Sequence, residues 1–357
     1  MAFKRLDPED FVVSSNSVTS TVWSNNTPSL NTYFTSSTQK EGTSGPYYLN
    51  VYQTASDSDS AAVQFQIAYG NKNGGGGVNF DSAVPNVSAT TTIYGQYRTL
   101  VLEDENANFI WGTTQTGSAN GDNDFYVISP ERARYKQTLF PGSLNLSIKS
   151  ANGVATNTFI ELTDNSNMVA LPTYYGTQRA YQIISGSDGV SYDGSLGYDT
   201  LVGSYGLFLP DISTILLSAY ALDQNSATMG INLATVQTAD TFGDNPTLLY
   251  DAISSSIAPN LPTSGNVFEL NSQETLTSDF VFIRARNSEY NYTENPSFIS
   301  GSTGEVLFPS FISNPQTYMT TVGLYSDTNE LLAVAKLSRP LVKDFTKEAL
   351  IRVKLDF

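Results

Sequence analysis

Three consecutive acidic residues, Glu103, Asp104 and Glu105, are the side chains of this sequence with the clearest chemical potential. Paired carboxylates can act as general acid and base, and a glycosidase holds two of them roughly 5–9.5 Å apart across a sugar groove. Here, however, the acids follow a predicted helix, and acidic residues are common in such turns. No pattern of aromatic and acidic residues singles out a pair, so we expect that the protein is not an enzyme.

Two missing residue types restrict the remaining chemistry. The 357-residue chain contains no cysteine and no histidine. Disulfides, thiol catalysis, Ser-His-Asp triads and the usual Cys/His zinc sites are therefore excluded.

Two loops resemble ion-binding sequences without meeting their requirements. Gly74–Gly77 is followed by Val78–Phe80, whereas a phosphate-binding loop needs Lys-Ser/Thr at that point, so we predict a flexible loop. The acids Asp188, Asp193 and Asp199 lack the alternate spacing and the closing glutamate of a calcium loop. We expect no catalytic, cofactor-binding or metal-ligating residues and no cofactor.

The charge balance argues against several classes of partner. With 34 acidic and 18 basic residues the net charge is −16, and nucleic acid binding requires clustered Lys and Arg. Six basic residues do gather near the end of the chain, but neighbouring acids nearly cancel them. There is no run of eighteen apolar residues that could span a membrane, and the segment MAFKRLDPEDF does not read as a signal peptide.

The composition favours β structure. Hydrophobic residues make up 40% of the chain and charged residues only 15%, with 26 Gly, 15 Pro and 21 Tyr. This profile is typical of short strands joined by many turns. We predict a mainly β, multi-domain, β-sandwich-like protein with a few short helices and long irregular loops.

The hydrophobic pattern places individual elements. The clearest is the last strand, where Ile351, Val353, Leu355 and Phe357 alternate with polar residues. The run Phe280–Ile283 is continuous and predicts a central strand. We expect helices at 92–102 and 130–140, a weaker helix at 229–236 and a loop at 242–262. We expect strands at 47–53, 63–69, 109–111, 125–128, 144–148, 159–163, 181–185, 206–209, 280–286, 318–325, 331–337 and 351–357. A turn is expected at 151–153, and 213–217 is either a strand or the start of a helix. The strand at 331–337 should end in a link that contains Pro340.

The order of these elements suggests how the chain is divided. Regular hairpins in 141–275 predict an inserted β-rich domain. Residues 1–140 and 276–357 together would form the main β domain, with an aperiodic N-terminal arm at 1–45 that orders only against other proteins. A serial arrangement of three domains is the alternative.

Several segments carry a resemblance to a known family. VGLYSDTNELLAVAKLSRPLVK, EALIRVKLDF, Arg284–Phe298, Gly206–Leu217 and Ile93–Leu100 resemble blocks of a virion structural protein family of contractile-tailed, myovirus-like phages, particularly those of marine cyanobacteria. The resemblance implies a tail or baseplate component that is made in the host cytoplasm and located in the virion. It brings no catalytic residues.

Composition and resemblance together favour a structural role. We expect a baseplate wedge protein that assembles with other virion proteins, in several copies or as a homo-oligomer, without nucleic acid or a membrane span. A carbohydrate-binding or carboxylate-based glycan-hydrolysing tail protein, or a neck or capsid-decoration protein, is the alternative.

Overall fold

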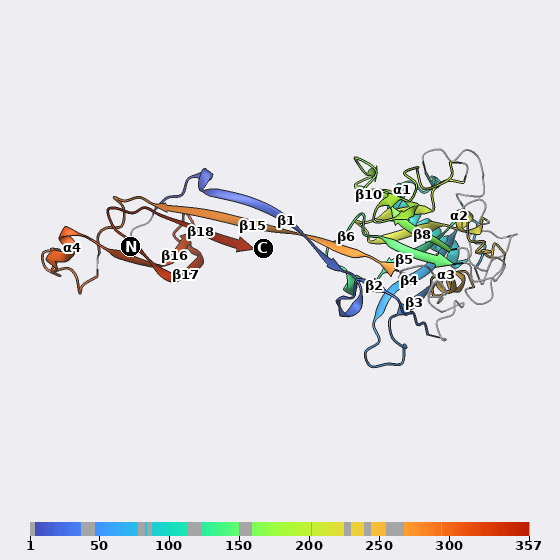
Figure 1. Ribbon diagram of the computed structural model, residues 1–357, viewed down its shortest axis with the longest axis horizontal. Coiled ribbons are helices and arrows are strands. Elements are labelled where there is room, and N and C mark those ends of the chain that lie inside the picture. Colours follow the sequence, from blue (N-terminus) through green and yellow to red (C-terminus); the bar gives the residue numbers. More distant parts are fainter. Residues whose placement is uncertain are drawn as a thin grey trace. The chain divides into compact units, whose positions relative to one another are not determined.

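The computed structural model describes residues 4–36, 47–77, 83, 88–112, 123–149, 159–200, 202–224, 230–238, 244–254, 268–293 and 295–356 (Figure 1). The chain forms two compact units. The larger unit is Val18–Glu274, and the smaller unit combines Met1–Ser17 with Thr275–Phe357. The described residues are mainly β, which confirms the class predicted from composition.

The larger unit is built on a twelve-stranded antiparallel sheet. The strands on its main path follow the order β2-β14-β7-β8-β10-β12-β13-β5-β4-β3, and β9 and β11 pair with β10. Their bounds are β2 Ser29–Leu30, β3 Tyr48–Tyr52, β4 Val63–Asn71, β5 Asp124–Pro130, β7 Asn145–Lys149, β8 Phe159–Asp164, β9 Thr173–Tyr175, β10 Gln178–Ser187, β11 Val190–Ser191, β12 Gly206–Leu209, β13 Thr214–Ser218 and β14 Phe268–Glu269.

The central strands bury both of their faces. Along β5, Tyr126 and Ile128 belong to one hydrophobic cluster, and Phe125 and Val127 belong to another. Successive side chains of a strand point to opposite faces, so the two clusters lie on opposite sides of the sheet. The sheet is therefore the middle layer of this unit.

Short helices contribute to these two clusters. Helix α1 (Ala89–Leu102) supplies Ile93, Tyr94 and Val101 to the cluster that contains Phe125. Helices α2 (Ala219–Asp223) and α3 (Asp244–Ser254) supply apolar residues to the cluster that contains Tyr126. The 3-10 turns Ser24–Asn26 and Arg132–Arg134 also lie in this unit.

The smaller unit contains most of a sheet of order β1-β15-β18, whose strands β1 and β15 extend into residues of the larger unit, and a separate hairpin. Its core is small: among the described residues, its hydrophobic cluster contains three buried side chains, those of Val281, Ile351 and Val353. Val281 pairs with Val353 and Ile283 with Ile351, so strand β15 is central, as predicted. The bounds are β1 Phe11–Thr21, β15 Asn271–Ala285, β16 Thr317–Tyr325, β17 Leu331–Lys343 and β18 Ala349–Asp356, with α4 at Pro309–Ser313 and a 3-10 turn at Pro8–Asp10. The short β6 (Thr138–Leu139) pairs with Ser272 and Gln273 of β15 within the larger unit.

Two predicted helices are wrong. The segment 130–140 forms no α-helix and, of helical structure, only the 3-10 turn Arg132–Arg134, because β5 continues to Pro130, which pairs with Phe65, and the Glu131 amide donates to the Gln64 carbonyl. Within 229–236, the described residues 230–236 are not helical either. There the Ile231 amide donates to the carbonyl of Leu222, which lies outside the segment.

Other local predictions also fail. Residues 109–111 form no strand, although Phe109 and Trp111 are buried. The segment 242–262 contains helix α3 rather than a loop, and β17 continues through Pro340 instead of ending before it. The predicted turn at 151–153 and Phe357 lie outside the described residues.

The division into units differs from the expected one. Strand β5 pairs with β13, so residues before and after position 140 share one sheet and 141–275 form no separate insertion. The predicted arm at 1–45 is also wrong in part. The core of the larger unit buries Val22, Trp23, Leu30 and Tyr33. Their spacing shows no regular period, but apolar residues from distant parts of the chain pack against them.

Candidate functional site

The acidic triplet picked out from the sequence does not form a site. Glu103 caps the C-terminus of α1 in the left-handed conformation, with φ of 56°. Asp104 accepts a hydrogen bond from the backbone amide of Asn106 at 2.8 Å, which is a turn interaction. All three acids are exposed.

The acidic loop considered for calcium has a structural role. Asp188 accepts a hydrogen bond from the Asn145 amide at 2.8 Å, and Asp193 accepts one from the backbone amide of Ser195 at 2.9 Å. In the part of the chain that the structure describes, no group of three acids is placed to hold a metal ion.

The glycine run forms a loop, as the sequence suggested, and this loop is buried. Gly74–Gly77 are buried, and the hydroxyls of Ser88 and Thr90 donate to the carbonyls of Gly74 and Gly75. Gly76 has φ of +71°, and a Cβ there would lie 2.3 Å from the Asn245 amide nitrogen. Glycine is thus required by conformation and by space.

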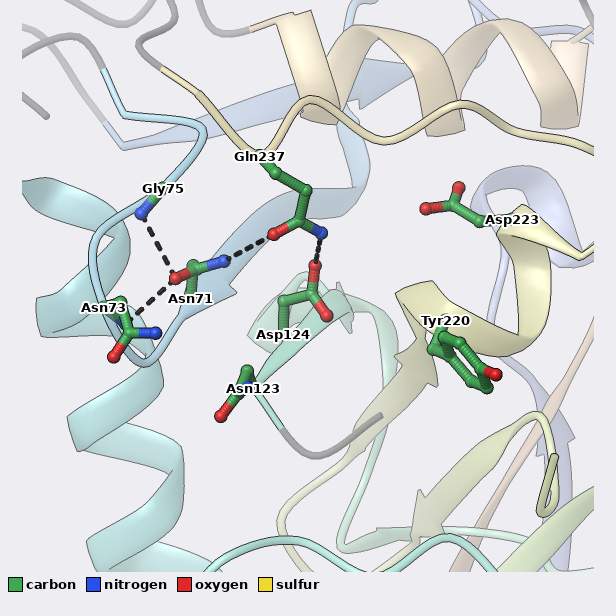
Figure 2. A pocket seen from close by; sticks show the side chains of 8 residues that line it. All are labelled: Asn71, Asn73, Gly75, Asn123, Asp124, Tyr220, Asp223 and Gln237. Atoms are coloured by element: carbon green, nitrogen blue, oxygen red, sulfur yellow. Dashed lines mark hydrogen bonds between the residues drawn. The ribbon is translucent and has the colours of Figure 1, made fainter. Parts of the chain in front are cut away.

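A polar pocket of about 430 Å³ lies in the larger unit (Figure 2). Its walls come from the end of β4 and the turn after it, the start of β5, helix α2 and the segment before α3. Amide and carboxylate side chains dominate, and no Lys or Arg is among the lining residues. These are Asn71, Asn73, Gly75, Asn123, Asp124, Tyr220, Asp223 and Gln237.

A chain of hydrogen bonds connects one wall of the pocket. The side-chain oxygen Oδ1 of Asn71 accepts hydrogen bonds from the backbone amides of Asn73 and Gly75, at 2.9 and 3.1 Å. The Asn71 amide then donates to Gln237 at 3.3 Å, and Gln237 donates to Asp124 (Figure 2). Tyr69 donates to the same oxygen of Asp124 at 2.7 Å. The amide of Asn71 therefore ties the β4 turn to the start of β5.

The pocket brings together two carboxyl groups whose pKa values are raised. Burial raises the pKa of Asp124 to about 6, against the opposing effect of hydrogen bonds from Tyr69 and Gln237. Burial also raises the pKa of Asp223, which accepts hydrogen bonds from the backbone amide and hydroxyl of Thr235 at 2.9 and 2.8 Å. The charge of Asp223 contributes a smaller upward effect on the pKa of Asp124.

Sequence reasoning missed this pocket. Its residues are spread from Asn71 to Gln237, and Asp124 looked like part of an acidic loop that precedes a strand. No local spacing connects them. The arrangement has the chemistry to hold a polar, uncharged or cationic group through amide and carboxylate oxygens.

We expect the buried Asp124 to make stability depend on pH. Because the folded chain holds this proton more tightly than the unfolded chain, protonation stabilises the fold below about pH 4, and this contribution is lost as pH rises through 6. Asp124→Asn removes the titration. The unfolding free energy of the variant minus that of the wild type should grow by about 2–3 kcal/mol between about pH 4 and pH 7.5.

Denaturant unfolding monitored by tryptophan fluorescence at several pH values measures this difference. Tyr69→Phe is the matched variant, because it removes a hydrogen bond that lowers the pKa of Asp124 and should move the loss of stability to higher pH. A difference that stays constant with pH would show that Asp124 titrates alike in both states.

Many large apolar side chains are exposed on the smaller unit. Val13, Leu332 and Leu350 are 68, 68 and 65% exposed. Large exposed apolar surfaces mark sites of protein–protein contact. The exposed apolar residues of the smaller unit include Phe11, Val12, Val13, Leu307, Phe308, Ile312, Tyr318, Leu331, Leu332, Val334, Leu341, Phe345 and Leu350.

Comparisons with known proteins give no relative. No family model, no curated protein and no solved structure matches the chain. Among the helices of the described residues, none combines the length and apolar character needed to cross a membrane.

Proposed function

We propose that this protein is a structural component of a phage virion, a tail protein of the baseplate wedge that assembles with other virion proteins. The observation that supports it best is the imbalance of the smaller unit between buried and exposed apolar side chains. Among the described residues, its cluster contains three buried side chains, while more than ten large apolar side chains are exposed. The resemblance of the C-terminal blocks to phage virion proteins agrees with this role.

The energetics of the smaller unit favour assembly over independence. Full burial of a Val or Ile side chain contributes about 1.5–3 kcal/mol, whereas ordering the backbone costs about 1–2 kcal/mol per residue. Hairpin β16–β17 has exposed residues along both strands and pairs with no other strand among the described residues. Its inward side chains pack on the cluster of Val281, Ile351 and Val353, so a neighbouring protein would cover the face of the hairpin that stays exposed.

A second candidate function rests on the polar pocket. The buried carboxyl group of Asp124, the half-buried one of Asp223 and the aromatic side chain of Tyr220 would suit a glycan ligand or carboxylate-based hydrolysis. Two observations make this function less favoured than the structural role. Asp124 is already engaged by Tyr69 and Gln237, and Asp223 by Thr235.

The test combines location with activity. Mass spectrometry of purified virions, then of separated tails, heads and baseplates, should find the chain in the baseplate fraction. The purified chain should release no reducing ends from host surface glycan. Absence from the particle would overturn the structural proposal, and presence only in neck or head fractions would overturn the baseplate assignment. Glycan hydrolysis that disappears in Asp124→Asn or Asp223→Asn would favour the second candidate.

A further inference from the structure

Strand β1 has an open hydrogen-bonding edge. It lies at the end of the β1-β15-β18 sheet, and within the described ranges no strand pairs with its outer side. An unpaired edge of eleven residues presents a row of backbone N–H and C=O groups that can template another strand.

The side chains of β1 add little support, although the Ser20 hydroxyl forms a hydrogen bond with the Ser272 hydroxyl of β15 at 2.9 Å. Nine of its eleven residues are exposed, on both faces of the strand, and the other two are half-buried. None of its residues belongs to the three hydrophobic clusters. One neighbour, β15, therefore holds it in the sheet.

The sequence of β1 lacks the features that normally protect an edge. FVVSSNSVTST contains no charged residue, no Pro and no Gly. The opposite edge of the same sheet is different, because β18 carries Arg352, Lys354 and Asp356. The uncharged strand β16 is interrupted by register shifts at Met319/Thr321 and Leu324/Tyr325. Charges and bulges are the usual protection against edge pairing, and β1 has no charge to offer.

We propose that the outer edge of β1 pairs in antiparallel fashion with β1 of a second copy of this chain. This proposal rests on the assembly role proposed above and identifies one partner, a second copy of the chain. Two sheets then join across a twofold axis in an isologous contact.

Charge explains why a second copy suits this edge. In any register, self-pairing of β1 opposes only uncharged side chains, and pairing centred on Asn16 places Val13 opposite Thr19 and Ser15 opposite Ser17. Such β-branched and hydroxyl pairs are favourable across strands. Self-pairing of β18 would bring Arg352 and Lys354 of two copies close together.

The distribution of net charge agrees with this choice. The smaller unit has ten basic and twelve acidic residues, a net charge of −2, whereas the larger unit has eight and twenty-two, a net charge of −14. Electrostatic repulsion between copies is therefore weakest for contacts made through the smaller unit.

The test uses the full chain and the double variant Val13→Lys/Thr19→Lys. Both side chains are exposed, so the substitution removes no buried contact, but it places lysines in the paired seam. Light scattering coupled to size exclusion should give twice the monomer mass of 38.7 kDa for the wild type at micromolar concentration. The variant should dimerise on the order of tenfold more weakly or worse.

Leu332→Lys/Leu350→Lys is the matched control. It adds the same charge at exposed apolar positions of the smaller unit and should leave the dimer intact. Unchanged tryptophan fluorescence unfolding verifies that the larger unit of each variant is folded, because Trp23 and Trp111 both lie there, and unchanged hydrogen exchange across 278–283 verifies the smaller unit. In the wild type, hydrogen exchange of residues 11–17 should be slow and should become fast in the β1 variant.

A wild type that remains monomeric at high micromolar concentration overturns this inference. So does a dimer that survives the β1 substitutions. Either result leaves the virion location intact, because that proposal is tested by finding the chain in the particle. Conversely, a β1-dependent dimer that is absent from virions would overturn the proposed function alone.

Discussion

Replacing Trp23 with alanine is expected to lower the unfolding free energy of the larger unit by about 3–5 kcal/mol. Trp23 is 2% exposed and lies 4.7 Å from the ring of Phe268 and 6.0 Å from that of Phe65. Its indole Nε1 also donates to the Phe268 carbonyl at 2.7 Å. Alanine would leave a large cavity and a buried carbonyl that has lost its donor.

The measurement is denaturant unfolding followed by the fluorescence of Trp111, the second tryptophan, which is buried in the same unit. Trp23→Phe should cost less, since it keeps an aromatic ring and loses chiefly the hydrogen bond, worth about 1–3 kcal/mol when a carbonyl stays buried. Tyr174→Ala, at a 59% exposed position, is the surface control and should change stability by about 0.5 kcal/mol at most. A Trp23→Ala variant as stable as this control would mean that residues 18–36 do not belong to the core.

Deleting Ile351–Phe357 is expected to unfold the smaller unit. The deletion removes strand residues that pair with Ser278–Ile283, together with two of the three buried side chains of the cluster. Burial of Ile351 and Val353 contributes about 1.5–3 kcal/mol each. Amide exchange across 278–283 should therefore accelerate about a hundredfold or more, since each 1.4 kcal/mol corresponds to tenfold.

Hydrogen exchange with mass spectrometry measures both units in one experiment. Strands β5 and β13 of the larger unit should keep their protection. Leu350→Ala is the control, because that side chain is 65% exposed and its loss should leave the exchange of β15 unchanged. Retained protection across 278–283 in the truncated chain would show that β18 is not part of the core.

Most strands could be predicted from short-range pattern. In β4 and β18, apolar residues alternate with polar ones, and in the structure the apolar positions face hydrophobic clusters. Helix α1 was found because its apolar residues recur with helical spacing. These features depend on neighbours within about ten residues, where the geometry of the backbone determines which side chains share a face.

Failures occurred where a distant segment outweighed the local signal. Ser129–Glu131 reads as a helix start, yet pairing with β4 extends β5 through Pro130. Helix α3 was predicted as a loop. Its residues Leu249, Ala252 and Ile253 can be recognised as a buried face only once they pack in the core cluster of the larger unit. Propensity is a weak preference that tertiary contacts override.

The sequence by itself determined the β class, the chemistry available without His or Cys, and the acidic charge, because each follows from residue type or from a local period. Only the tertiary structure decided that residues 18–274 form one unit, that Trp23 lies in its core and that Asp124 and Asp223 line one pocket. It likewise decided that β1 is an edge strand. The physical reason is the same in each case. The backbone N–H and C=O groups of a strand form hydrogen bonds with another strand, and no local sequence pattern tells how far along the chain that partner lies.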